Sequence, residues 1–272
     1  MPSQTNSQIS VPADFNPERP FEINVSETKL SGNWIPRHNA KMIREAMENS
    51  TAPFLPNEKG EIVARPIYNA NTGFCLNAKD LIPLQIVAKN NQAANYSTIV
   101  ATKSSIDAAQ TSVKAGEKGF FYNFKRKDGS IGTTQFFFPE QTEHPDRVID
   151  VAAKRISAMQ NRYRENSGNA RVHGTVEITS PNAEEYLAKY IAACKTHSIL
   201  KCAPEVAVEF KKNFLNLLNN YSARKGSNIS ELLFNADKKS AEIVKQLTVE
   251  RHDAGQHKSP TKKHKIEMSI SH

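Results

Sequence analysis

Hydrophobic and polar positions in the first two thirds of the chain predict short helices and strands in alternation. Apolar residues three or four positions apart predict helices over residues 37–49, 78–90 and 148–163. Runs of aromatic and β-branched residues predict strands over residues 96–102, 120–124, 133–138 and 172–178. The Asp-Gly pair in the cluster at 127–130 predicts the turn of a β-hairpin between the second and third strands. We therefore expect an α+β fold with a small mixed or antiparallel sheet and flanking helices.

Proline and capping residues predict where two of these helices begin. Pro83 fits only the first turn of a helix, because proline has no N–H to donate. The second helix should therefore begin near Asn77 or Asp80. After the first strand, Ser104 or Ser105 should cap a short helix, because a serine hydroxyl accepts from the exposed N–H groups of the first turn.

From Ser180 onward the pattern predicts helices only. Ser180 and Pro181 resemble a helix cap followed by a first-turn proline. Apolar stripes at helical spacing then predict three helices, one after Ser180 and two over residues 204–221 and 230–247. We accordingly expect a mostly irregular arm, an α+β domain, a helical extension and a disordered basic tail, at residues 1–36, 37–179, 180–250 and 251–272.

The charge of the chain narrows the class of partner. Its 272 residues carry a net charge of +8, with a mean hydropathy of −0.56. Such a balance favours polyanions, with nucleic acid first and acidic membrane surfaces second. A protein with an ordinary basic tail is the plainer interpretation. Part of the charge should lie on the polar face of the helix over 148–163, which carries Lys154, Arg155, Arg162 and Arg164.

Three cysteines and an N-terminus without a signal peptide predict a cytoplasmic protein that does not enter a membrane. An odd, small number of cysteines favours a reducing compartment. The first ten residues lack the basic and apolar regions of a signal peptide. No stretch approaches the length of a membrane-spanning helix.

The densest chemical signal is the loop over 114–119, which carries two lysines and two glycines and leads into an aromatic strand. Glycine lets a backbone approach a ligand closely, lysine neutralises phosphate, and aromatic rings stack on unpaired bases. The hairpin turn adds Lys125, Arg126 and Lys127. Taken alone, the loop is better interpreted as a common glycine–lysine turn before a strand. Its glycine spacing is not that of a P-loop.

Three motifs follow one another over residues 65–124: Arg65-Pro-x-Tyr68-Asn69-x-x-Thr72-Gly73, then Asn77-Ala78, then Val113-Lys114-x-Gly116-Glu117-Lys118-Gly119. In order and spacing they resemble the N-terminal single-stranded-DNA-binding domain of ArdC-type plasmid antirestriction proteins, also found in TraC-type primases. A weaker likeness continues through Phe136–Pro139 and Gln141–Glu143. The chain departs from the family at Cys75 and Leu76, where the family has tyrosine and glycine, and at Ser104 and Ser105.

The resemblance implies binding of single-stranded DNA without sequence preference. Phosphates would be neutralised by Arg65, Lys103, Lys114, Lys118, Lys125 and Arg126. Gly116 and Gly119 would permit close approach of the backbone. Bases would stack on Tyr68, Tyr96 or Tyr122. The expected role is conjugative transfer or antirestriction for a plasmid or other mobile element.

We expect no enzymatic activity, cofactor or metal. Full-length relatives carry a zinc peptidase domain with H-E-x-x-H, and this chain has no His-Glu dipeptide. Cys194, His197 and Cys202 are better interpreted as structural residues than as metal ligands, because Cys194 lies on an apolar helix stripe. The alternative function is a non-catalytic interaction or secretion-associated protein, which binds a partner or itself through residues 180–250.

Overall fold

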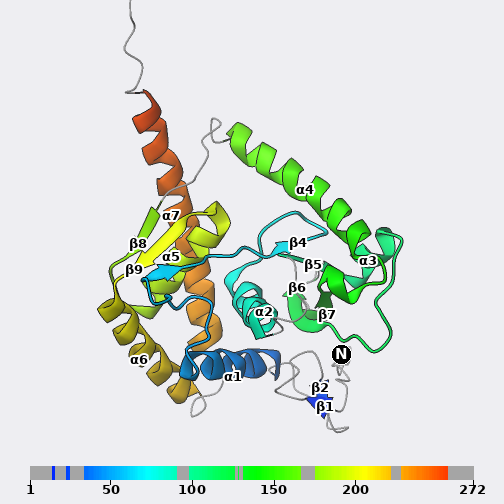
Figure 1. Ribbon diagram of the computed structural model, residues 1–272, viewed down its shortest axis with the longest axis horizontal. Helices are drawn as coiled ribbons and strands as arrows, with labels where there is room; N and C mark the ends of the chain where they lie inside the picture. Colours follow the sequence, from blue (N-terminus) through cyan, green and yellow to red (C-terminus); the bar gives the residue numbers. More distant parts are fainter. Residues whose placement is uncertain are drawn as a thin grey trace, which may run out of the picture.

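The computed structural model describes residues 14–15, 23–24, 34–90, 98–125, 128, 131–166, 175–221 and 228–256. These residues form a mixed α and β protein, as the sequence predicts, with a four-stranded sheet and, beyond the single sheet expected, a three-stranded one (Figure 1). The helices are α1 (Trp34–Glu48), α2 (Ala78–Asn90), α3 (Lys103–Ala108), α4 (Pro145–Asn166), α5 (Ala183–Thr196), α6 (Pro204–Tyr221) and α7 (Asn228–Gln256). A 3-10 turn, η2, spans Pro139–Gln141.

The larger sheet has the strand order β4-β5-β7-β6. Its strands are β4 (Tyr68–Asn69), β5 (Ile99–Thr102), β6 (Phe120–Lys125) and β7 (Ile131–Phe137). β4 runs parallel to β5, and β5 runs antiparallel to β7. β6 and β7 form the predicted hairpin, paired from Phe120 opposite Phe136 to Lys125 opposite Ile131. Of its turn, only Asp128 lies within the described residues.

Both faces of this sheet are covered by helices. On one face Val100, Phe120 and Phe136 pack in the same cluster as the residues of α2. On the other face, apolar residues of β5 and β7 pack against α3 and α4 in a second cluster formed by Ala70, Ile99, Ala101, Ile106, Ala109, Phe137, Val148 and Ala152. A sheet buried on both sides needs apolar residues at consecutive positions, which explains the run Ile99–Ala101.

The smaller sheet has the order β3-β9-β8, formed by Glu61–Ile62, Ile199–Cys202 and Thr175–Ile178. β8 and β9 are parallel and α5 joins them, so this part of the chain is a βαβ unit. The expectation of helices only after residue 180 is therefore wrong. In β9, Leu200 and Cys202 are buried whereas Ile199 and Lys201 are exposed. An alternation of only four residues, lying between two predicted helices, is too short to be recognised as a strand from the sequence.

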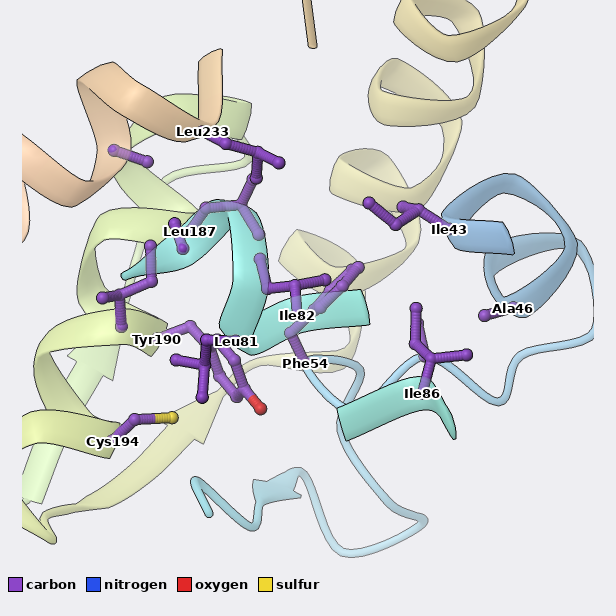
Figure 2. Packing of buried hydrophobic residues seen from close by; sticks show 14 of the residues in the cluster. Ile43, Ala46, Phe54, Leu81, Ile82, Ile86, Leu187, Tyr190, Cys194 and Leu233 are labelled. Atoms are coloured by element: carbon purple, nitrogen blue, oxygen red, sulfur yellow. The ribbon is translucent and has the colours of Figure 1, made fainter. Parts of the chain in front are cut away.

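Helix α2 lies at the centre of the main core. Seven consecutive residues, 81–87, are buried. Figure 2 shows Leu81, Ile82 and Ile86 between side chains of α1, α5 and α7. The cluster joins residues on both sides of the expected boundary at residue 180, and β3 pairs with β9 across the same boundary. The segment 180–250 therefore completes the core rather than extending it.

Pro83 lies in the second turn of α2, whereas the sequence predicts it in the first. The helix begins at Ala78, which places Pro83 in its second turn. A proline there leaves the carbonyl of Lys79 without its usual donor. The side chain of Pro83 is buried with the rest of the helix, so packing holds α2 together across this missing hydrogen bond.

Two helix caps differ from those expected. Thr102 caps α3, and its hydroxyl accepts from the N–H of Ser105. Asn182 caps α5, with its side-chain oxygen 3.1 Å from the nitrogens of both Glu184 and Glu185. Both capping residues have extended backbones, which an N-cap requires. Ser104, Ser105 and Ser180 therefore do not serve as the caps of these helices.

The ends of the described chain differ from the expected arm and tail. Helix α1 begins at Trp34, and a short strand pair joins β1 (Asp14–Phe15) to β2 (Ile23–Asn24). Helix α7 continues past residue 250 to Gln256, and residues 257–272 lie outside the described part. Among the described helices, none combines the length and apolarity needed to cross a membrane.

Candidate nucleic-acid interface

The loop between α3 and β6 is a tight, exposed turn. The N–H of Glu117 donates to the carbonyl oxygen of Lys114 at 3.2 Å. Gly116 has a φ of +84°, a left-handed conformation that favours glycine. A Cβ atom placed on Gly116 would meet nothing within 4 Å. The outer side of this turn is therefore open to a ligand.

Buried Gln141 fixes this turn to the body of the protein. Its Nε2 donates to the Oε2 of Glu117 at 2.8 Å and to the carbonyl oxygen of Lys118 at 3.1 Å. Its Oε1 accepts from the N–H of Phe138 at 2.9 Å. Its carbonyl oxygen accepts from the N–H of Lys114 at 2.9 Å. Sequence reasoning placed Gln141 only in a weak likeness and missed this anchoring role, because an anchor requires long-range contacts.

Three of the predicted lysines lie around the same part of the sheet. Lys114 and Lys103 are exposed, and Lys118 is half-buried. The Nζ of Lys114 donates to the carbonyl oxygen of Glu140 at 2.9 Å, which directs this side chain along the loop. Thr102 and Phe120 are both paired with Phe136, so they are two strand spacings apart, about 10 Å. Lys103 directly follows Thr102, and Lys118 lies two residues before Phe120.

Gly119 does not have the predicted role. It is buried, and a Cβ atom there would lie 2.8 Å from the Cβ of Gln135, the carbonyl oxygen of Phe136 and the Cζ of Phe137. The missing side chain therefore allows β6 to enter the sheet beside β7. It does not open the backbone to a ligand.

The two described tyrosines of the predicted site already contact other side chains. The ring of Tyr122 is half-buried and stacks on Phe136, with centroids 3.8 Å apart and planes at 6°. The hydroxyl of Tyr68 lies 2.5 Å from the Nε2 of His197, and the two rings are stacked with centroids 6.1 Å apart. Burial raises the pKa of Tyr68 to about 12. Both rings are therefore held by contacts within the protein.

Strand register places these tyrosines on opposite faces of the sheet. Tyr68 is opposite Ile99, and Ala101 is opposite Phe137. Residues paired across two strands point to the same face of a sheet, and so do residues two apart along one strand. Tyr68 therefore shares its face with Ile99, with Ala101 two residues later, and with Phe137. Tyr122 shares its face with Phe136, which points the other way. One strand of DNA crossing one face therefore cannot stack on both tyrosines.

Arg65 lies away from the basic loop, near the edge formed by β4. Its carbonyl oxygen accepts a hydrogen bond from the Nε2 of Gln85. Burial, together with the charge of Arg65, lowers the pKa of Lys89. β4 and β6 are the two edges of the sheet, three strand spacings or about 14 Å apart (Figure 1). The predicted cations therefore form at least two separate groups.

The hairpin tip and the segment before β5 carry the remaining predicted residues. Lys125 is the last residue of β6, opposite Ile131. Six residues of extended strand put it about 17 Å from Phe120 along β6. The side chain of Lys125 and all of Arg126 and Tyr96 lie outside the described residues.

The motif at Asn69–Gly73 forms a compact turn against α4. The Oδ1 of Asn69 accepts from the N–H of Asn71 at 2.8 Å, and Gly73 has a φ of +74°. A Cβ atom on Gly73 would lie 2.6 Å from the carbonyl oxygen of Arg155. The Nη1 of Arg155 donates to the carbonyl oxygen of Ala70 at 3.0 Å and to Asn71 at 3.1 Å. Arg155 therefore binds this turn and does not belong to a solvent face.

The same turn presents an aromatic residue that sequence reasoning missed. Phe74 is 59% exposed. Its carbonyl oxygen accepts from the N–H of Asn69, which places Phe74 beside the β4 edge. An aromatic residue directly after a glycine turn was the signal available in the sequence. Phe74 offers a stacking surface that neither Tyr68 nor Tyr122 offers.

Two of the three cysteines, Cys194 and Cys202, are buried. Cys194 is buried, its Sγ lies 3.6 Å from the Nε2 of Gln85, and burial raises its pKa to about 12. The Sγ of Cys202 donates to the carbonyl oxygen of Ala203 at 3.4 Å. Within the described residues, no three His, Cys, Asp or Glu side chains gather as a metal site would require.

Comparison of the chain with protein-family models, curated proteins and solved structures finds no match. The geometry of the loop, its anchor and its cations is therefore the basis on which a function is assigned.

Proposed function

We propose that the chain binds single-stranded DNA without sequence preference, through the turn over 114–118 and the neighbouring Lys103. The observation that carries the proposal is the turn itself, which is open at Gly116 and flanked by lysines. Anchoring by Gln141 keeps the turn in one conformation, so little conformational entropy is lost on binding. The net charge of +8 supports a polyanionic ligand.

The aromatic part of the proposed interface is assigned to Phe74 rather than to the tyrosines. Its exposed ring can stack on an unpaired base, which is worth roughly 1–3 kcal/mol per base. Arg65 and Lys89 lie near the same edge and would neutralise phosphates there. DNA bound to both edges would pass around the sheet rather than over one face.

Fluorescence anisotropy on a labelled oligo-dT tests this proposal. Replacing both Lys114 and Lys118 by alanine should weaken binding and reduce the salt dependence. For single strands the slope of log K against log salt should fall by about 1.4 in magnitude when two phosphate contacts are lost. The matched control replaces Lys154 and Lys212, which are exposed on α4 and α6, and should leave the slope closer to that of the parent.

The possible outcomes separate function from site. Absence of binding to oligo-dT at low salt contradicts the proposed function. Binding that persists unchanged in the Lys114→Ala, Lys118→Ala variant contradicts the assignment of this turn. Reduced affinity in a Phe74→Ala variant, with an unaltered salt slope, supports stacking by Phe74.

We further propose that this binding serves conjugative transfer or antirestriction in the cytoplasm of a bacterium that carries the mobile element. The motifs at residues 65–124 support this role by their resemblance to plasmid proteins. The test is a mating assay: deleting the gene from the donor should lower the transfer frequency, or lower survival of the transferred DNA in a restricting recipient. Equal transfer and survival without the gene contradict this role.

A second candidate function is a protein interaction that uses the second half of the chain. The apolar stripes of α5, α6 and α7 are largely used in the core, but Val208 on α6 is 70% exposed. Val63 and Ile199 are also exposed and continue the register of β3 and β9, so they form a small apolar patch. Self-association measured by light scattering, and its loss in an Ile199→Asp, Val208→Asp variant, would favour this function.

A further inference from the structure

A cavity of about 380 Å³ lies where the start of α2 meets α1 and the start of α7. Figure 1 shows these three helices side by side. The cavity is lined by Asn39 of α1, by residues 77–80 and by five residues of α7 between Ile229 and Asp237. Its size is that of a small-molecule site. It is separate from the basic loop.

Among the described residues, a buried carboxylate that accepts no hydrogen bond lines this cavity. Asp80 is only 7% exposed. Its backbone N–H donates to the carbonyl oxygen of Asn77 at 3.1 Å, but across the described chain no hydrogen bond reaches its side chain. Burial raises the pKa of Asp80 to about 7. A buried carboxylate normally accepts hydrogen bonds, and the described residues place only the positive charge of Lys79 near this one, so its oxygens point to a donor from outside those residues.

The other acidic side chain in the cavity is already compensated. The Oδ1 of Asp237 lies 3.0 Å from the Nζ of Lys195 and 3.3 Å from the N–H of Ala78. The Oδ1 of Asn39 is buried and has no partner among the described residues. The carboxylate of Asp80 and the amide oxygen of Asn39 thus leave oxygen acceptors unfilled at one cavity.

The rest of the wall is mainly apolar. Ile229 and Leu233 are buried, and Phe234 is 67% exposed. These three residues lie on α7 and line the cavity together. A ligand that fits this cavity therefore needs an apolar portion to pack on these side chains, as well as a hydrogen-bond donor for the acceptor oxygens.

We propose that this cavity binds a small organic cation, a primary ammonium group on an aliphatic or aromatic stem. The ammonium donates to Asp80 and Asn39, and the stem packs on Ile229, Leu233 and Phe234. A charge-assisted hydrogen bond to a desolvated carboxylate is stronger than one between neutral groups. An anion would face the carboxylates of Asp80 and Asp237, which outweighs the attraction of the N-terminus of α2. Magnesium would find too few oxygen ligands.

Calorimetry on the full chain with 2-phenylethylamine tests the site. At pH 8 this amine should bind at least tenfold more tightly than 2-phenylethanol, which has the same stem and no charge. Asp80→Asn should lower the affinity for the amine at least tenfold. Asp150→Asn, on the exposed side of α4, is the matched control and should change nothing. Ser230→Trp, at an exposed position on the cavity wall, should block binding without removing a charge.

Affinity for the amine should also fall about tenfold between pH 8 and pH 6, because protonation of Asp80 removes its charge. Primary amines stay protonated over this range. The titratable groups near Asp80 are Lys79, Asp237 and Tyr122 of β6, with Lys195 beside Asp237. Equal binding of amine and alcohol, binding of neither, or preferential binding of Mg²⁺ would each overturn the proposal. None of these results bears on oligo-dT binding.

Discussion

At the residue scale, Gly116 and Gly119 belong to one loop but lack a side chain for different reasons. Gly116 needs its left-handed backbone, with open space around it, whereas Gly119 needs room beside β7. We expect Gly116→Ala to cost about 1 kcal/mol from backbone strain. Gly119→Ala should cost about 3 kcal/mol, because strand backbone has to move. Urea unfolding measures both changes. Gly116→Asn should cost less than Gly116→Ala, since asparagine tolerates this conformation, and equal costs at the two glycines would contradict these roles.

The buried carboxyl of Asp80 predicts a pH dependence of stability. Its pKa rises from 3.8 to about 7 on folding, so the folded state binds the proton more tightly. The stability that it contributes is therefore present below about pH 4 and is lost as pH rises through about 7. The full difference corresponds to on the order of 4 kcal/mol. Asp80→Asn should be more stable than the parent at pH 8 and nearly equal to it at pH 4.

Urea unfolding of both proteins at pH 4, 6 and 8 isolates this effect, because all other groups are shared. Asp150→Asn, an exposed change of the same kind, should follow the parent at every pH. A constant difference between Asp80→Asn and the parent would contradict titration of Asp80 in this range.

At the scale of elements, Gln141 connects the 3-10 turn η2 to the basic loop. Gln141→Met keeps the volume but leaves the buried N–H of Phe138 and carbonyl oxygen of Lys118 without this partner. We expect the free energy of unfolding to fall by about 1–3 kcal/mol. Affinity for oligo-dT should fall as well, because the loop becomes less ordered. Gln246→Met, exposed on α7, is the control. Unaltered binding by a folded Gln141→Met variant would show that the order of the loop does not matter.

Elements whose burial repeats along the chain were predictable from the sequence. Helix α6 spans Pro204–Tyr221 as expected, because a proline starts it and Phe210 and Phe214 mark one buried face. The hairpin was predictable because its two strands are neighbours in sequence. Strand β9 was not, because its partners β3 and β8 precede it by many residues.

In the candidate site, too, local features were predictable from the sequence and features that depend on distant contacts were not. The exposed turn at Gly116 follows from local glycine and lysine chemistry, and the structure describes it as a turn. The positions of Tyr68 and Tyr122 depend on the pairing of four strands, and no local pattern records that pairing. The sequence marks Asp80 only as a possible helix start, because the α7 residues that line the cavity with it lie far along the chain.

At the scale of the whole molecule, one core unites the two halves of the chain. Phe54, which precedes the larger sheet, packs edge-on against Tyr190 of α5 and Phe210 of α6, with ring centroids 5.9 and 6.0 Å apart. The hydroxyl of Tyr186 donates to the carbonyl oxygen of Phe54 at 2.9 Å. Cutting the chain at residue 180 therefore exposes a large apolar surface on both pieces.

We expect neither residues 34–179 nor residues 180–256 to fold alone, because each piece would expose the surface that the other buries. Mixed in equal amounts, the two pieces should associate and regain cooperative unfolding, measured by circular dichroism and urea titration. Leu200→Asp in the second piece should prevent this association, since Leu200 is fully buried opposite Ile62 in the sheet that joins the halves. Lys212→Asp, an exposed change on α6, should allow it. Cooperative unfolding of residues 34–179 alone would contradict a shared core and would restore the boundary that the sequence suggests.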